Sequence, residues 1–319
     1  MWRGGSEDEM ELRQPAELAT LYELEPDIRD IIVEGYNDKS YVDWFLSHVD
    51  NHGLLIRTYP VGDRVYITDS DVSDAGYLTG ARGRVIYLAQ LLVDIAPDCH
   101  SALLIADADY ASIGLDSSPR IPGLRYTDYA SLESYALTEK VLEKMLRVVF
   151  SAPDSITGRD LIAEIRPGLE AMFLISVCLR ETNVGVSVSA KAVDHVPLGV
   201  ECPKDAVVEI FRTSLRENIR AHKPADLWNR FVELRKLILE DIRSFSRGHD
   251  IAVFIVKFLK RKCPRVFTKE DGRRRGLQDS SLLELALMSC LEYDEIRNEA
   301  LFLHIEQWLD ADVRSQSTG

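Results

Sequence analysis

The sequence predicts an α/β protein in which a mostly parallel sheet flanked by helices is followed by a mainly α-helical C-terminal domain. Two apolar runs that end in acidic residues, IIVEG from Ile31 and ALLIADAD from Ala102, have the composition of strands buried on both faces. Helical periodicity separates these runs and continues through most of the chain after Leu137. Strands that alternate with helices in this way are typical of a parallel sheet.

The elements of the sheet region follow in order along the chain. The strand at 31–35 leads into a helix over 38–53, where large apolar residues recur at helical spacing before Gly53 ends it. Two further strands are expected at 54–61 and 64–72, on either side of a Gly-Asp turn. A helix over 84–95 then precedes the apolar strand that ends in Asp107 and Asp109.

The helical part begins where strand patterns stop. Five amphipathic or apolar segments are expected to be helices, at 138–150, 158–181, 226–245, 249–262 and 280–309. The stretch 184–205 is rich in β-branched residues and is expected to be an extended insertion. We therefore divide the chain into a flexible leader (1–14), a catalytic domain (15–140), a mainly helical domain (141–312) and a tail (313–319).

The composition is that of an ordinary globular protein, with 46% hydrophobic and 28% charged residues over 319 positions. Five cysteines without CxxC spacing indicate free thiols in a reducing compartment. The N-terminal segment lacks the apolar core of a signal peptide, and no stretch reaches the roughly 18 uncharged apolar residues of a membrane span. We therefore expect a cytoplasmic protein with no membrane association.

The formal net charge is −14, which argues against a protein that coats nucleic acid nonspecifically. Such binding depends on many Lys and Arg contacts to phosphates. An acidic nuclease stays compatible with this charge, because a metal ion and a local basic patch can carry the phosphate contacts.

Acidic residues follow both apolar strands. Glu34 ends the first, Asp38 lies one helical turn later, and Asp107 and Asp109 end the other strand, two positions apart, so that they would share one face of it. Carboxylates gathered in this way repel one another unless a cation lies among them. Mg²⁺ or Mn²⁺ is expected, because hard cations prefer oxygen ligands. Capping of a strand or of the following helix is the simpler alternative for a lone DxD.

The same residues resemble a known family. IIVEGYNDKSYVDWFL followed by ALLIADADY is similar to the TOPRIM domain of topoisomerases, bacterial primases and OLD nucleases, with a strand-end glutamate followed by glycine and then a DxD, over about residues 30–137. The later YTDYASLESYAL resembles the stand-alone TOPRIM nucleases of anti-phage loci, the AriB family of the PARIS defence system. The resemblance implies a TOPRIM-type sheet and a metal-dependent nuclease.

The resemblance also implies roles for individual residues. Glu34 would be a catalytic acid or base or a metal ligand, with Asp107 and Asp109 holding the metal. Asp38 and Glu133 would complete a second metal position, so that two ions could clamp the attacking and leaving oxygens of a phosphodiester.

Two further residues are candidates for catalysis. His249 lies in SRGHD, which resembles a Gly-(Lys or His)-Asp element of the stand-alone family, although a helix-capping or buried structural role is the alternative. Lys191 is a candidate for the lysine that OLD nucleases use near their metals, and an ordinary exposed lysine is its alternative.

A basic segment stands out against the acidic background. Its cationic residues are candidates for an RNA- or DNA-binding patch: Lys260, Arg261, Lys262, Arg273, Arg274 and Arg275. The alternatives are a solvated helix end whose charges complement the helix dipole, or a surface that binds an acidic partner.

These features lead to one functional hypothesis with two alternatives. The chain is expected to be the toxic, metal-dependent nuclease of an anti-phage system, cleaving RNA, with tRNA implied by the resemblance. An AriA-like ATPase subunit would control it, and no GxxxxGK[ST] motif occurs in this chain. A catalytically silent TOPRIM scaffold and a Mg²⁺-dependent phosphohydrolase using the DxD are the alternatives. Dimerisation is left open.

Overall fold

The computed structural model describes residues 12–50, 53–115, 118–182, 188, 192–215, 222–267 and 276–316. The chain forms two compact units that are interleaved along the sequence. The first comprises residues 1–108, 118–128 and 293–319, and the second comprises 109–117 and 129–292. This division differs from the expected one at residue 140, because the end of the chain returns to the first unit.

The first unit contains a four-stranded, all-parallel sheet with the strand order β2-β1-β3-β4. The strands are β1 (Ile28–Val33), β2 (Leu55–Pro60), β3 (Ala102–Ala106) and β4 (Leu124–Tyr126). The register pairs Ile31 with Thr58 on one side and with Leu103 on the other. The predicted α/β class with a parallel, helix-flanked sheet is therefore confirmed.

The segment 64–72 is not a strand, contrary to the prediction. It contains the end of α3 (Val61–Arg64) and the start of α4 (Asp69–Asp74). A reciprocal cap starts α4, since the backbone N–H of Thr68 donates to Asp71 and the backbone N–H of Asp71 donates to the Thr68 hydroxyl. This local capping outweighs the strand propensity of the β-branched residues beside it.

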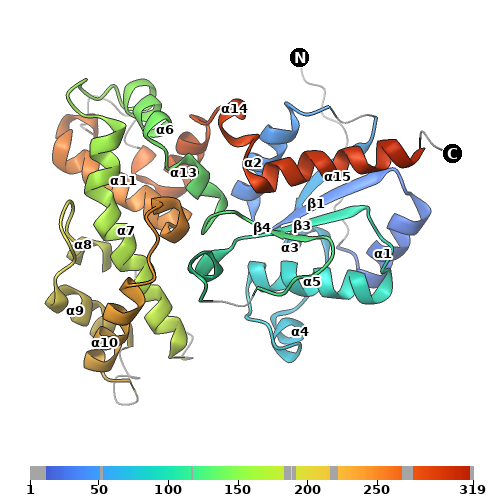
Figure 1. Ribbon diagram of the computed structural model, residues 1–319, viewed down its shortest axis with the longest axis horizontal. Helices are drawn as coiled ribbons and strands as arrows, with labels where there is room; N and C mark the ends of the chain where they lie inside the picture. Colours follow the sequence, from blue (N-terminus) through green and yellow to red (C-terminus); the bar gives the residue numbers. More distant parts are fainter. Residues whose placement is uncertain are drawn as a thin grey trace. The chain divides into compact units, whose positions relative to one another are not determined.

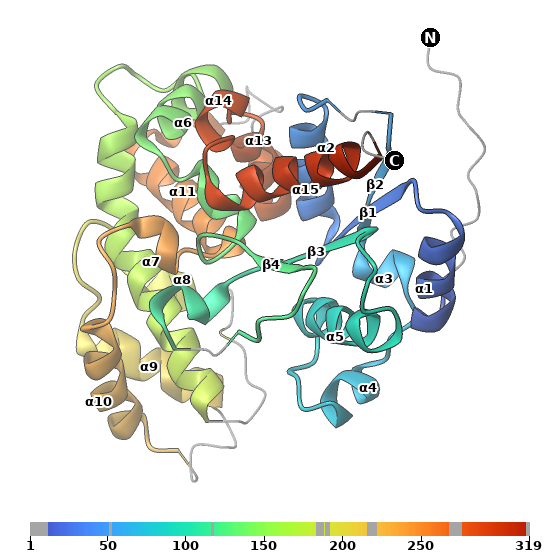
Figure 2. The same ribbon diagram turned by 45° about the vertical axis from the view of Figure 1, so that its right-hand side comes forward.

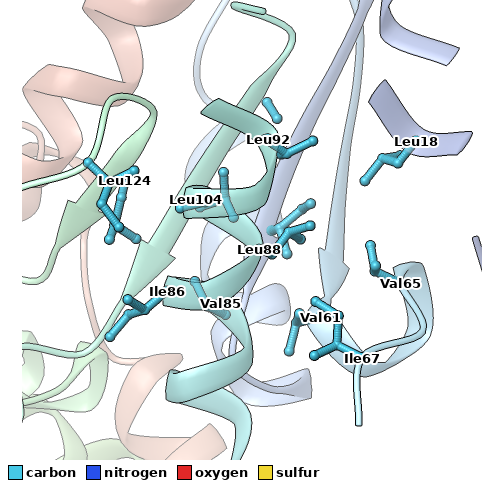
Figure 3. Close-up of a cluster of buried hydrophobic side chains, with 14 of the residues drawn as sticks. Leu18, Val61, Val65, Ile67, Val85, Ile86, Leu88, Leu92, Leu104 and Leu124 are labelled. Atoms are coloured by element: carbon cyan, nitrogen blue, oxygen red, sulfur yellow. The ribbon is translucent and has the colours of Figure 1, made fainter. Parts of the chain in front are cut away.

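Helices cover both faces of the sheet. On one face, α5 (Ala81–Ile95) packs with α1 (Pro15–Leu24) and with α3 and α4. Figure 3 shows the apolar core of this face, to which α1, α5, β3 and β4 contribute Leu18, Leu88, Leu104 and Leu124. Burial of these side chains excludes water from one side of the sheet and fixes the strand ends that carry the acids.

The other face is covered by α2 (Tyr36–Leu46) and by α15 (Ala300–Gln316), which lies across the strands on the side away from α5 (Figures 1 and 2). The ring of Phe302 packs against Phe45 and edge-on against Tyr41, with centroid separations of 4.7 and 5.7 Å. The start of α15 is held by the carboxylate of Asp128, which accepts a hydrogen bond from the Leu301 N–H.

The second unit is helical. Its long central helix α7 (Gly158–Glu181) packs against α11 (Gly248–Lys262), as Figure 1 illustrates. The other α-helices among its described residues are α6 (Glu139–Lys144), α8 (Ala192–His195), α9 (Lys204–Leu215), α10 (Pro224–Arg235) and α13 (Ser280–Met288). Short 3-10 turns include η1 (Asp109–Ile113), η2 (Leu132–Ala136), η5 (Ile242–Phe245), η6 (Pro264–Phe267) and η7 (Gly276–Gln278), and η3 (Met145–Val149) is a π-helical turn.

Several helix predictions need correction. The segment 280–309 contains α13, α14 (Tyr293–Ile296) and the first part of α15, and 226–245 contains α10 and η5. Part of the expected insertion at 184–205 forms α8, and the expected tail is helical as far as Gln316. Residues 1–11 of the expected leader lie outside the described residues. No described helix is both long and apolar enough to cross a membrane.

Candidate active site

Glu34 and Asp107 lie together at the carboxyl end of the sheet. They directly follow β1 and β3, which are neighbouring parallel strands and therefore end at the same edge. The backbone N–H of Asp107 donates to Oε1 of Glu34 over 2.8 Å. Open parallel sheets bind their ligands at this edge, so the pair has the position of an active-site feature.

Asp38 occupies the first turn of α2. Its Oδ2 accepts a hydrogen bond from the backbone N–H of Gly35 over 2.9 Å. This contact matches half of a capping box and satisfies a donor at the helix N-terminus. The structure therefore gives Asp38 a structural role beside Glu34, and its predicted role as a metal ligand stays a prediction.

Arg82 contacts the same strand end and was not singled out from the sequence. Its Nε donates to the backbone carbonyl of Asp107 over 2.8 Å, and one terminal nitrogen donates to Ser118 Oγ over 3.1 Å. Its guanidinium lies 5.7 Å from the ring centroid of Tyr126. Arg82 thus ties the segment after β3 to the chain before β4. Nothing in the periodicity of α5 marks this residue, because its partners are 25 and 36 positions away.

Asp109 does not share a strand face with Asp107, contrary to the prediction. The strand β3 ends at Ala106, and Asp109 begins η1 with a φ of 46°. Asp belongs to the few non-glycine residue types that adopt this left-handed conformation readily. The backbone N–H of Asp109 donates to the carbonyl of Ala130 over 3.0 Å, within the second unit.

Glu133 lies against the start of α11, also within the second unit. A Cβ atom added to Gly248 would be 2.4 Å from the Glu133 carboxyl carbon, so a larger residue here would require the Glu133 side chain to move aside. The positive end of the α11 dipole favours a carboxylate at this place. Both η1 and η2, which carry Asp109 and Glu133, pack against η5. The glycine of SRGHD therefore has a structural reason that the motif alone did not reveal.

The other two catalytic candidates stay predictions. His249 is an exposed residue in the first turn of α11. Lys191 lies outside the described residues.

The predicted basic patch is partly used for contacts within the second unit. Arg261 donates to the carbonyl of Leu198 and pairs with Glu164, and Lys262 pairs with the same Glu164 over 2.6 Å. Lys260 is exposed at the end of α11. The remaining candidates, Arg273, Arg274 and Arg275, lie outside the described residues. Two of the six predicted cations therefore have a structural role in addition to any role in binding.

The chemistry of the donor set fits a hard divalent ion. Glu34 and Asp107 supply carboxylate oxygens at the sheet edge, which is the ligand type that Mg²⁺ and Mn²⁺ prefer. Within the described ranges, no three or more His, Cys, Asp or Glu side chains are gathered as a preformed metal-binding group. Of the five predicted ligands, Glu34, Asp38 and Asp107 belong to the first unit, and Asp109 and Glu133 to the second.

Comparisons with known proteins assign no family to the chain. No protein-family model matches it, and a search of curated proteins returns no match.

Proposed function

We propose that the chain is a metal-dependent nuclease of TOPRIM type. The observation that carries this proposal is the hydrogen-bonded pair of Glu34 and Asp107 at the carboxyl edge of a parallel sheet. A ligand-binding edge with two acidic residues agrees with the strand-end glutamate and DxD pattern of the sequence. The resemblance to the TOPRIM nucleases supplies the reaction class.

In the proposed mechanism, Asp107 and Asp109, which are two residues apart in the sequence, would hold a divalent ion. Glu34 either joins these ligands or exchanges a proton with the attacking water or the leaving oxygen. A bound Mg²⁺ or Mn²⁺ supplies Lewis acidity and compensates the charge of the phosphodiester. Arg82 keeps the Asp107 backbone in place through its hydrogen bond to the carbonyl oxygen. Asp38 and Glu133 are the proposed ligands of a second ion.

The proposed substrate is RNA, and the resemblance to the AriB family favours tRNA. The same resemblance suggests an anti-phage effector that an AriA-like ATPase subunit restrains, in the cytoplasm. The chain carries no GxxxxGK[ST] motif, so ATP hydrolysis of that type would come from the other subunit. The proposed phosphate contacts are the exposed residues Lys260, Arg261 and Lys262 together with the arginines at 273–275.

Metal binding by the isolated chain tests the proposal, because binding does not require the ATPase subunit. Calorimetry with Mn²⁺ would compare the wild type with Glu34→Gln and Asp107→Asn, and with Asp74→Asn as a control that removes one exposed carboxylate from α4. We expect the first two variants to lose Mn²⁺ binding and the control to keep it. Equal Mn²⁺ binding in all four proteins would reject the site.

Cleavage assays separate the proposed nuclease from the two alternatives. A nuclease requires that Glu34→Gln abolish Mn²⁺-dependent cleavage of RNA, assayed with and without the ATPase subunit. A DxD phosphohydrolase would retain its activity on a phosphomonoester in this variant, because its chemistry does not need the glutamate. A scaffold would retain partner binding in Asp107→Asn and would cleave nothing.

A further inference from the structure

Arg247 joins three parts of the second unit through its side chain. Its guanidinium donates to the Asp250 carboxylate over 2.9 Å and to the hydroxyl of Ser176, on α7, over 3.0 Å. The other terminal nitrogen donates to the hydroxyl of Tyr110, in η1, over 3.3 Å. Arg247 precedes α11 directly, so one side chain connects the start of α11, the C-terminal part of α7 and the turn that carries Asp109.

The acidic member of this network is sheltered from water. Asp250 is 6% exposed, and the Arg247 side chain is 30% exposed. A buried carboxylate is costly unless it is paired, and Arg247 provides the pair. The ring of Tyr110 packs against that of Phe173, with the two centroids 5.4 Å apart. The guanidinium of Arg180 lies 4.8 Å from the Tyr110 ring centroid. These contacts restrict the side-chain conformation of Tyr110.

Asp109 is close enough to act electrostatically on this network. Burial raises the pKa of Tyr110 and the charge of Arg247 opposes this, while the carboxylate of Asp109 raises it further. For Arg247, burial alone would lower the pKa, but Asp250 and the charge of Asp109 are among the groups that raise it above the usual value. The network therefore lies within electrostatic range of the second carboxylate of the DxD.

Hydrogen bonds hold the turn around Asp109, whose φ of 46° lies in the left-handed region that Asp tolerates. The hydroxyl of Ser112 donates to the carbonyl of Asp109 over 2.6 Å and also contacts the carbonyl of Ser244. These contacts of Ser112 hold the turn to its own first residue and to η5. The hydrogen bond from Arg247 to Tyr110, the residue next to Asp109, holds the same turn to the start of α11.

We propose that Arg247 is a positioning residue that holds the turn carrying Asp109, a proposed metal ligand, through its hydrogen bond to Tyr110. The guanidinium suits this task because it offers five donors in a rigid plane, and here it serves an acid and two hydroxyls at once. A lysine could keep the charge but not all of these directed bonds. The effect on the turn stands on the structure alone, and the effect on metal binding rests on the proposed function.

Two variants test the inference, with one matched control. Tyr110→Phe removes only the hydroxyl and keeps the ring packing, and Arg247→Lys keeps the charge. Arg230→Lys is the control, because Arg230 also pairs with an acid, Glu181, in the second unit, but on its exposed surface. The first measurement is hydrogen–deuterium exchange of a peptide that covers residues 109–115. We expect exchange to be faster in both test variants and unchanged in the control.

The second measurement is the Mn²⁺ affinity, followed by electron paramagnetic resonance of the free ion at a temperature where all variants are folded. Loss of a residue that orients a metal ligand commonly weakens metal binding by about 10- to 100-fold, and we expect a weakening of about tenfold here. Cleavage should return toward the wild-type rate at saturating Mn²⁺. A purely structural defect would lower that rate without changing the Mn²⁺ requirement.

The outcomes separate this inference from the proposed function. Unchanged exchange at 109–115 in both test variants overturns the positioning role. Faster exchange with a control-like Mn²⁺ affinity overturns the link to the metal and leaves the nuclease proposal standing. A wild-type protein that binds no Mn²⁺ overturns the proposed function, and the metal part of the inference fails with it, whereas the exchange result still decides whether Arg247 holds the turn.

Discussion

The backbone N–H of Asp107 donates to the carboxylate of Glu34, although 73 residues separate the two in the chain. This bond joins the ends of two neighbouring strands. It also gives Glu34 a structural task beside any chemical one, because its carboxylate satisfies a partly buried backbone donor. Substitutions of Glu34 that keep or remove the hydrogen-bond acceptor can separate the structural role of this residue from its chemical role.

Glu34→Gln and Glu34→Ala are expected to differ in stability but not in metal binding. Gln retains an oxygen that can accept from Asp107, whereas Ala leaves the donor unpaired, at a cost of about 1–3 kcal/mol in the free energy of unfolding. Both remove the carboxylate charge and should lose Mn²⁺ binding. Urea unfolding and calorimetry measure the two effects. Equal stability of the two variants would mean that the hydrogen bond contributes little.

Gly248→Ala is expected to be destabilising because its methyl group would overlap the Glu133 carboxylate. The overlapping atoms are the end of the flexible Glu133 side chain, which can turn aside, so we expect about 1 kcal/mol, the lower end for an added methyl group in a packed contact. In a double-mutant cycle, Glu133→Ala should recover most of this loss, since the overlap disappears with the side chain. Thermal unfolding of the four proteins measures the coupling. Additive effects would contradict the close contact between the two residues.

Arg82→Ala is expected to weaken Mn²⁺ binding as well as stability. The variant leaves the Asp107 carbonyl without its charged donor, which is worth roughly 1.5–3 kcal/mol in typical cases. Ser118→Ala, which removes only the outer partner of Arg82, should have a smaller effect on both. Calorimetric Mn²⁺ titration beside urea unfolding ranks the two variants. A larger effect from Ser118→Ala would show that the loop, rather than Asp107, depends on Arg82.

Phe302→Ala is expected to destabilise the first unit strongly. The ring is fully buried and packs on the aromatic side chains of α2. Truncation of a buried Phe commonly costs about 3–5 kcal/mol. Leu303→Ala, on the exposed side of α15, is the matched control. Similar unfolding free energies for the two variants would mean that α15 is not an integral part of this core.

Acidification is expected to destabilise the protein through His304. Burial, and then the charge of Arg125, hold the pKa of His304 below its usual 6.5, so the folded state binds a proton less readily than the unfolded state. The stabilising contribution is therefore present above pH 6.5 and is lost as the pH falls toward the lower folded-state pKa. Urea unfolding at pH 7.5 and 5.5 should show a smaller loss in His304→Gln than in the wild type. An equal loss would assign the pH dependence to other groups.

The sequence by itself determined the class of the first unit and the position of its strand-end acids. Continuous apolar runs are sufficient to identify the buried strands β1 and β3, and the residues that follow a strand lie at its carboxyl edge. The same local pattern predicts a strand at 64–72, where the reciprocal cap of Thr68 and Asp71 starts a helix instead. It also placed Asp109 on a strand, because a periodicity of two says nothing about where a strand stops.

Only the tertiary structure decided which distant residues meet. The bond of Arg82 to the Asp107 carbonyl, the contact of Gly248 with Glu133 and the bond of Arg247 to Tyr110 join positions 25, 115 and 137 residues apart. The return of α15 to the first unit is of the same kind. Periodicity and composition report the preferences of neighbouring residues, whereas these contacts depend on how whole elements pack, and packing is determined by the summed burial of many side chains.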